Sequence, residues 1–305
     1  MDTELAVVGA GAAGYTAAIY AGRAGIDAIV FDTGMGGGLS TWAPRIENYP
    51  GFPDISGVDL MDRMKEHAEP YADFHYNEEV TAIEPDGDGF KVTTAKNTYT
   101  AGAIIIATGT TPRQLDVPGE NKLRGRGVSY CATCDGSFFT DKKVAVVGGG
   151  NSAVNEAIYL HGLGCNVTLI HRRDQLRAEE ALAQEVDKKD IPVIWNTVVE
   201  EIRGDPVVET LALKNRKTGE TTQQAFDGVF ISVGETPQSS LATSLGIETD
   251  SHGYIQTDER QRTTVNGVYA AGDVTGDIRQ IITACAEGAT AALTSMHTLG
   301  KSYPF

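Results

Sequence analysis

The sequence lacks the long hydrophobic runs and the surplus of basic residues that would place a protein in a membrane or on nucleic acid. No apolar run in its 305 residues reaches the roughly 18 needed to cross a bilayer. With 25 Lys and Arg against 41 Asp and Glu, the net charge is −16, which argues against a nucleic-acid surface. The first residues have no basic region ahead of an apolar stretch, so we expect no signal peptide and a cytoplasmic protein. Such acidity suits either an ordinary soluble enzyme or a protein adapted to high salt.

Cysteine is also scarce, with four in the chain and two of them in the stretch SYCATCDG. Structural disulfides are rare in the cytoplasm, and zinc usually needs about four ligands from two CxxC or CxxH pairs. Cys165 and Cys285 supply no second pair, so we expect no metal. Cys131 and Cys134 are instead expected to cycle between dithiol and disulfide. Asp135, which follows them, is expected to be either a proton donor or a solvated turn acid.

A nucleotide-binding pattern opens the chain at ELAVVGAGAAG. The apolar run Leu5–Val8 predicts a buried parallel strand, and Gly9, Gly11 and Gly14 follow it in GxGxxG spacing. An alanine-rich helix and a second strand come next, ending on Asp32. The glycines would let a pyrophosphate approach the helix N-terminus, and the acid would accept hydrogen bonds from a ribose. The pattern predicts an FAD or NAD site, with a glycine-rich packing turn as the alternative.

The same pattern returns at KKVAVVGGGNSAVNEA. Its turn residues are Gly148, Gly150 and Ala153, in GxGxxA spacing. Here the second strand ends on HRRDQLR rather than on an acid, and this motif supplies His171, Arg172, Arg173 and Arg177. Arginines at this position favour a 2′-phosphate over a free hydroxyl, so the second site is predicted to take NADP(H). The alternative is a solvated charged face.

Two dinucleotide folds in one chain predict a flavoenzyme that receives hydride from a nicotinamide nucleotide. Buried strands at 103–115 and 228–238 each lead to a crossover, and the segment from Gly267 predicts a strand, a turn with Asp273 and a helix from about Arg279. We therefore expect an α/β protein with two Rossmann-like, three-layer domains, the second inserted into the first. The expected domains are 1–115 with 245–305 for FAD, and 116–244 for NADPH with the CATC pair.

Seven motifs in this order carry a family resemblance. They are GAGAAG at 9–14, ENYPG at 47–51, ATG at 107–109, CATCDG at 131–136, GGGNSA at 148–153, HRRDQLR at 171–177 and AAGDV at 270–274. With them, nearly the whole chain resembles the low-molecular-weight thioredoxin reductases, class II pyridine nucleotide–disulfide oxidoreductases. One departure is Gly38, where the family often has Gln. This loop resembles some archaeal members, although those lose the arginine motif that is kept here.

The resemblance implies a thioredoxin-disulfide reductase that passes electrons from NADPH through FAD to the Cys131–Cys134 pair and then to a thioredoxin-like protein. It implies that Cys134 lies nearest the flavin, that Cys131 attacks the partner disulfide and that Asp135 manages protons. It also implies a homodimer, and an NADPH domain that rotates on linkers near 113–117 and 240–247. The implied FAD contacts are Gly9, Gly11, Ala12, Ala13, Gly14, Asp32, Gly37, Gly38, Leu39, Asn48, Thr108, Gly109, Gly272, Asp273, Arg279, Gln280 and Ile281. The implied NADPH contacts are Gly148, Gly150, Asn151, Ser152, Ala153, His171, Arg172, Arg173 and Arg177.

Two other classes of function stay open at this point. The first is an enzyme of the same fold with another donor or acceptor: ferredoxin, deazaflavin, a peroxiredoxin system or oxygen. The peroxiredoxin type usually carries an additional N-terminal thioredoxin-like region, whereas here the first fingerprint begins at Glu4. The second class is a flavin- or nucleotide-binding sensor, which would have no need of a dithiol placed for the flavin.

Overall fold

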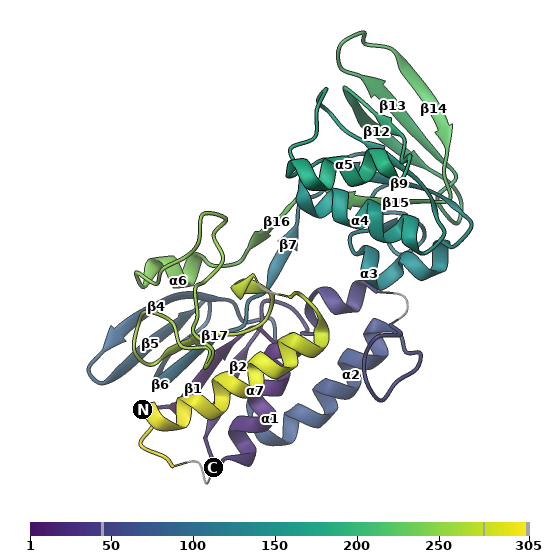
Figure 1. Ribbon diagram of the computed structural model, residues 1–305. Helices are drawn as coiled ribbons and strands as arrows, with labels where there is room; N and C mark the ends of the chain where they lie inside the picture. Colours follow the sequence, from purple (N-terminus) through teal and green to yellow (C-terminus); the bar gives the residue numbers. More distant parts are fainter. Residues whose placement is uncertain (44–45, 277, 303–305) are drawn as a thin grey trace. The chain divides into compact units, whose positions relative to one another are not determined.

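The chain divides into two units (Figure 1). The computed structural model describes residues 1–43, 46–276 and 278–302. Unit 1 comprises Met1–Thr41, Tyr49–Thr111 and Thr236–Phe305, and unit 2 comprises Trp42–Asn48 and Pro112–Glu235. The divisions fall after residues 111 and 235, whereas the sequence placed them after 115 and 244, and the segment 42–48 groups with unit 2. The nucleotide assigned to each unit stays a prediction.

Unit 1 is built on a seven-stranded sheet in the order β3-β2-β1-β6-β5-β4, with β17 paired to β6. Its strands are β1 (Thr3–Val8), β2 (Ala28–Phe31), β3 (Asp73–His75), β4 (Val80–Asp86), β5 (Gly89–Thr94), β6 (Thr98–Ile106) and β17 (Val268–Ala270). Strands β3, β2, β1, β6 and β17 pair in parallel, and β4 and β5 add an antiparallel meander. β1 is apolar along Leu5–Val8 because both faces of the sheet are covered and all four residues are buried.

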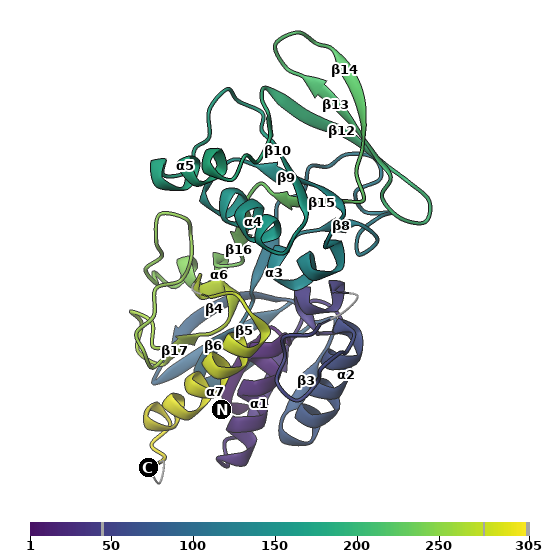
Figure 2. The same cartoon turned by 45° about the vertical axis from the view of Figure 1, so that its right-hand side comes forward.

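Helices α1 and α7 lie side by side in unit 1 (Figures 1 and 2). The helices of this unit are α1 (Ala12–Arg23), α2 (Gly57–Ala68), α6 (Ser240–Ser244) and α7 (Ile281–Thr298), with short 3₁₀ turns η1 (Gly38–Trp42), η2 (Glu69–Tyr71) and η4 (Asp273–Thr275). A Cβ atom on Gly288 would lie 2.1 Å from the carbonyl oxygen of Ala13. Only glycine allows α7 to pass this close to the first turn of α1.

Unit 2 contains a parallel sheet in the order β11-β10-β9-β15-β8 and an antiparallel sheet β12-β13-β14. Its strands are β8 (Val128–Ser129), β9 (Lys143–Gly148), β10 (Asn166–Ile170), β11 (Val193–Ile194), β12 (Thr197–Arg203), β13 (Thr210–Asn215), β14 (Thr221–Ala225) and β15 (Gly228–Ser232). Its helices are α3 (Ala132–Asp135), α4 (Asn151–Gly162) and α5 (Glu180–Lys188), with the 3₁₀ turn η3 (Gly136–Phe139).

Alternating side chains of β9 give unit 2 its three layers. Val144 and Val146 pack with the residues of α4 and α5, whereas Ala145 and Val147 pack with those of β12 and β13. Successive residues of a strand point to opposite faces, so one apolar strand supplies both cores. The expected α/β class with Rossmann-like units is confirmed.

The two chain segments that connect the units, β7 (Thr110–Pro112) and β16 (Glu235–Pro237), pair with each other in a two-stranded sheet. Among the described residues, no helix is both long enough and apolar enough to cross a membrane.

Candidate active site

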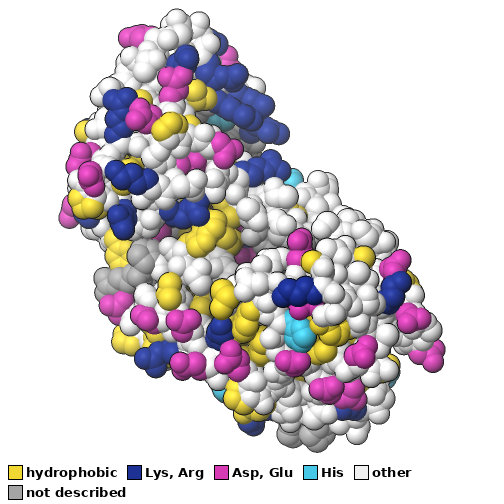
Figure 3. Space-filling view, turned by 180° about the vertical axis from the view of Figure 1, so that it is seen from behind, with side chains coloured by type: hydrophobic (Ala, Val, Ile, Leu, Met, Phe, Trp, Pro, Cys, Tyr) yellow, Lys and Arg dark blue, Asp and Glu magenta, His cyan; other side chains and the backbone are white. Residues whose placement is uncertain are grey.

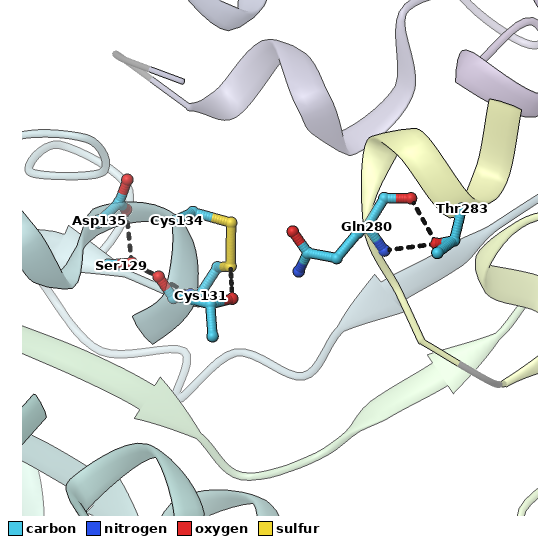
Figure 4. Close-up of a disulfide and its surroundings, with 7 residues drawn as sticks. Ser129, Cys131, Cys134, Asp135, Gln280 and Thr283 are labelled. Atoms are coloured by element: carbon cyan, nitrogen blue, oxygen red, sulfur yellow. Dashed lines mark hydrogen bonds between the residues drawn. A yellow bond between two sulfur atoms is a disulfide. The ribbon is translucent and has the colours of Figure 1, made fainter. Parts of the chain in front are cut away.

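Cys131 and Cys134 form a disulfide at the start of the short helix α3 (Figure 4). Their Cα atoms lie 5.3 Å apart, within the range that a disulfide bridges. Cys131 is the N-cap, and its carbonyl oxygen accepts from the backbone N–H groups of Cys134 at 3.3 Å and Asp135 at 3.1 Å. Both cysteines keep some exposure to solvent. The helical turn therefore brings the two sulfur atoms together and leaves them accessible.

Asp135 has one carboxylate oxygen enclosed and the other held by a serine. The Ser129 hydroxyl donates to Oδ2 at 2.6 Å, while Oδ1 is buried and has no hydrogen-bond partner among the described residues. Burial raises the pKa of Asp135, and the bond from Ser129 opposes that shift only in part. The carboxyl group therefore holds its proton more tightly than a solvated turn acid does.

Ser129 also belongs to this site, although none of the seven family motifs contains it. Besides donating to Asp135, its Oγ accepts from the backbone N–H of Cys131 at 3.1 Å (Figure 4). One hydroxyl therefore links the redox pair to the acid that follows it. The only sequence signal was a small hydroxyl residue two positions before the first cysteine, which is too common to be specific.

Glu120 is a second residue that the motifs did not reveal. It is fully buried, and its carboxylate accepts from the backbone N–H groups of Leu115 at 3.0 Å and Asp116 at 2.8 Å and from the hydroxyl of Tyr130 at 2.6 Å. Buried carboxylates are stable only with such partners. Glu120 thereby ties the start of unit 2 to the residue next to Cys131.

The first glycine loop, between β1 and α1, packs as its spacing predicts. A Cβ atom on Gly9 would lie 2.3 Å from the carbonyl oxygen of Ala107, and one on Gly14 would lie 1.8 Å from the carbonyl oxygen of Gly9. Gly11 is the N-cap of α1, provides no side-chain hydrogen bond, and faces open space. The N–H groups of the first helical turn are therefore left for a ligand, which fits a pyrophosphate.

Asp32 stands at the end of β2 beside this loop. Its Oδ2 accepts from the backbone N–H of Ala10 at 2.8 Å, and its Oδ1 accepts from that of Gly34 at 2.8 Å. The carboxylate is held against the glycine loop, where a ribose on that pyrophosphate would lie.

Three distant segments of unit 1 meet the first glycine loop. The N–H of Gly37 donates to the carbonyl oxygen of Ala10 at 2.7 Å, and a Cβ atom on Gly38 would lie 3.6 Å from Cα of Gly11. The second segment contains Thr108, and its Cα would lie 3.2 Å from a Cβ atom placed on Gly9. The third contains Gly272, where an added Cβ atom would lie 3.0 Å from Cβ of Ala13. The structure thus assembles predicted FAD contacts that lie far apart in sequence.

The remaining predicted FAD contacts lie on several elements. Leu39 is in η1, Ala12 and Ala13 open α1, Gly109 follows β6, Asp273 opens η4, and Ile281 opens α7. Gln280 is the N-cap of α7 and shares a capping box with Thr283, drawn in Figure 4, and Arg279 donates to the hydroxyl of Tyr254 at 2.7 Å. Asn48 belongs to the segment 42–48, which is part of unit 2.

The second glycine loop, between β9 and α4, repeats the arrangement of the first. Gly150 is the N-cap of α4 without a side-chain hydrogen bond, and it also faces open space. Ala153 is buried, Ser152 is exposed, and Asn151 exchanges two hydrogen bonds with Glu179. A Cβ atom on Gly148 would lie 2.3 Å from the carbonyl oxygen of Ser232. This loop, too, leaves helix N–H groups for an anionic ligand.

The HRRDQLR motif lies against the second glycine loop. His171 is buried, with its ring 2.2 Å from where a Cβ on Gly149 would stand, and its Nε2 is enclosed without a partner among the described residues. Burial lowers the pKa of His171, and the nearby arginines add to that effect. The backbone N–H of Arg177 donates to the carbonyl oxygen of Gly149 at 2.6 Å. The His171 ring therefore packs against the glycine loop at Gly149, and the backbone of Arg177 is hydrogen-bonded to the same loop.

Arg172, Arg173 and Arg177 are all exposed. Within the part of the chain that the structure describes, none of them pairs with a carboxylate. In a chain of net charge −16, three free guanidinium groups at one strand end fit an anionic ligand better than a solvated face.

Comparison with known proteins places this geometry in a family. Residues 3–288 match the model for "Pyridine nucleotide-disulphide oxidoreductase". The chain belongs to that family. Within it, the thioredoxin reductase of Treponema pallidum is 45% identical over 294 residues, covering 95% of each chain, and that of Bacillus subtilis is 42% identical over 299 residues, covering 96% and 94%.

Solved pyridine nucleotide-disulphide oxidoreductases show the same fold. The crystal structure of thioredoxin reductase from Streptococcus pyogenes matches with a TM-score of 0.93 and 44% identity, covering 98% of each chain. The expected membership among the low-molecular-weight thioredoxin reductases is confirmed.

Proposed function

We propose that this chain is a flavin-dependent thioredoxin-disulfide reductase. It carries electrons from NADPH through FAD and the Cys131–Cys134 pair to a disulfide of a thioredoxin-like protein. The observation that carries the proposal is the Cys131–Cys134 disulfide with the enclosed Asp135 beside it, in a chain 45% identical to a thioredoxin reductase. Its relatives also favour this function over the same fold with a ferredoxin, deazaflavin, peroxiredoxin or oxygen partner.

Unit 1 is proposed to hold FAD and unit 2 to hold NADPH. The loop at Gly9–Gly14 would bind the FAD pyrophosphate and Asp32 its ribose, because the loop is open and Asp32 is fixed against it. The loop at Gly148–Ala153 would bind the NADPH pyrophosphate, with Arg172 and Arg173 at the 2′-phosphate. When bound, FAD would accept hydride and pass the two electrons to a disulfide.

The chain's own residues then exchange disulfides. On taking up two electrons, the Cys131–Cys134 bond opens to a thiol and a thiolate, and Asp135 supplies a proton to the Cys134 sulfur. Cys131 attacks the partner disulfide as a thiolate, forming a mixed disulfide and releasing one partner thiolate. Cys134 then returns its proton to Asp135 and attacks Cys131 in that adduct as a thiolate, which releases the reduced partner and restores the Cys131–Cys134 bond.

We propose a homodimer, a cytoplasmic location consistent with the four cysteines, and a hinge at the connecting strands β7 and β16, where the two units divide. These strands lie just before the linkers expected near 113–117 and 240–247.

An anaerobic titration tests the proposal. NADPH should bleach the flavin band near ~450 nm, the usual signature of a reduced flavin cofactor. NADH and reduced ferredoxin at similar concentration should not bleach that band. Replacing Cys134 with Ser should leave flavin reduction by NADPH intact, abolish thioredoxin turnover, and accumulate a mixed disulfide through Cys131. The control Cys165→Ala changes a buried cysteine outside the pair and should keep turnover. Full turnover in Cys134→Ser would refute the redox-pair assignment.

A further inference from the structure

A hairpin turn in unit 2, distant in sequence from the HRRDQLR motif, lies against it. Arg216 and Lys217 begin the turn between β13 and β14. Arg216 donates from Nη1 to the carbonyl oxygen of Arg172 at 3.4 Å, 44 residues away in sequence. Its backbone N–H donates to the carbonyl oxygen of Asn196, and the N–H of Asn196 donates to that of Arg173. The guanidinium of Arg216 is thus held against the backbone of the motif at Arg172, one of the two arginines predicted to bind the 2′-phosphate.

The turn is rigid enough to place these side chains. The Asn215 side-chain oxygen accepts from the backbone N–H groups of Lys217 at 2.9 Å and Thr218 at 3.0 Å. The N–H of Asn215 donates to the carbonyl oxygen of Glu220 across the turn at 2.8 Å. An Asn that bonds the next backbone groups in this way fixes a turn locally, so the backbone that carries Arg216 is set by the turn itself.

Lys217 compensates the single acid within the motif. Its Nζ lies 2.9 Å from Oδ2 of Asp174, and this pairing lowers the pKa of Asp174. Without Lys217, a carboxylate two residues from Arg172 would repel an incoming phosphate. The motif and the hairpin turn that contacts it together carry five cations, Arg172, Arg173, Arg177, Arg216 and Lys217. In Figure 3, dark-blue Lys and Arg side chains gather on the visible face of unit 2.

We propose that Arg216 is a further specificity residue for the 2′-phosphate of NADPH, and that Lys217 supports it by neutralising Asp174. The inference rests on the proposed function, since it adds a hairpin residue to the phosphate subsite of unit 2. Within the described residues Arg216 has no carboxylate partner. Its remaining N–H groups are therefore free to donate to a phosphate oxygen in a charge-assisted bond.

The test measures binding of two probes to the flavin-loaded protein by calorimetry: adenosine 2′,5′-bisphosphate, which has the 2′-phosphate, and ADP, which does not. Arg216→Ala should weaken binding of the bisphosphate about tenfold, because one charge-assisted bond is lost, and should leave binding of ADP unchanged. Arg216→Lys should give an affinity for the bisphosphate between those of Arg216→Ala and the unaltered protein. Added salt should shrink the difference.

Lys217 should act through Asp174 only. Lys217→Ala should weaken binding of the bisphosphate by roughly two- to threefold, since surface ion pairs have small effects. Adding Asp174→Asn to that variant should restore the affinity. The matched control is Lys214→Ala, a cation on the same hairpin that pairs with Glu200, and it should bind both probes as the unaltered protein does.

Two results would overturn the proposal in different ways. If Arg216→Ala binds both probes as Lys214→Ala does, or weakens both equally, Arg216 does not read the 2′-phosphate. If the unaltered protein itself binds the bisphosphate no better than ADP, the NADPH assignment of unit 2 fails, and the role of Arg216 fails with it.

Discussion

Replacing Asp135 with Asn should change stability and activity in opposite directions. The amide has the shape of the carboxyl group and keeps an oxygen that can accept from Ser129, whose hydroxyl lies 2.6 Å from Oδ2. What it removes is a charge next to an enclosed oxygen that has no partner among the described residues. The substitution therefore separates two effects: the cost of the buried charge, seen in the free energy of unfolding, and the loss of the proton donor, seen in turnover.

The effect on stability depends on pH in a definite direction. Because the pKa of Asp135 is raised in the folded protein, the folded state holds its proton more tightly than the unfolded state does. The unaltered protein therefore loses stability as the pH rises through the folded pKa. At neutral pH, Asp135→Asn should raise the free energy of unfolding by about 1 kcal/mol, the lower end of the cost of an unsatisfied buried group. The gain should vanish in acid, where Asp135 is neutral.

Thioredoxin-dependent turnover should fall by roughly 10²–10⁴-fold in the same variant, the usual contribution of a positioned acid–base group. Flavin reduction by NADPH should be unaffected, since it does not use Asp135. Ser129→Ala should raise the pKa of Asp135 further, because the bond from Ser129 stabilises the charged form. The alkaline limb of its rate profile should then move to higher pH.

The assays are NADPH oxidation with oxidised thioredoxin from pH 5 to 9, and urea unfolding at neutral pH and in acid below the ordinary carboxyl pKa of about 3.9. Asp187→Asn, which removes an exposed carboxylate from α5, is the control and should change neither activity nor the pH dependence of stability. Turnover and a pH profile in Asp135→Asn equal to those of the unaltered protein would exclude Asp135 as the proton donor.

Two other substitutions test the supports of the site. Asp32→Asn should weaken FAD binding to the apoprotein about tenfold through loss of a charge-assisted bond, measured by flavin titration, whereas Asp62→Asn on the exposed side of α2 should bind FAD normally. Glu120→Ala should lower the free energy of unfolding by roughly 3 kcal/mol, because three part-buried donors lose their acceptor. A loss under 1 kcal/mol by urea unfolding would contradict the support assigned to Glu120.

The family, the fold class and the chemistry were predictable because short motifs carry them. The GxGxxG spacing needs no partner elsewhere in the chain to show that a strand turns tightly into a helix, and CATC places two sulfur atoms within one helical turn. The apolar runs of β1 and β9 likewise indicate strands covered on both faces. The roles assigned to individual contact residues stay predictions.

Other features depend on residues that only folding brings together. No motif contains Ser129, and its importance comes from burial that encloses the Asp135 carboxylate. Arg216 is an unremarkable turn residue in the sequence, yet it lies against Arg172, 44 residues away. Gly37 likewise reaches Ala10 only after β2 has paired with β1. Motif spacing determines what neighbours along the chain can do, whereas the pKa of a carboxyl group and the charge around a phosphate site depend on which distant groups the packing places within hydrogen-bond reach.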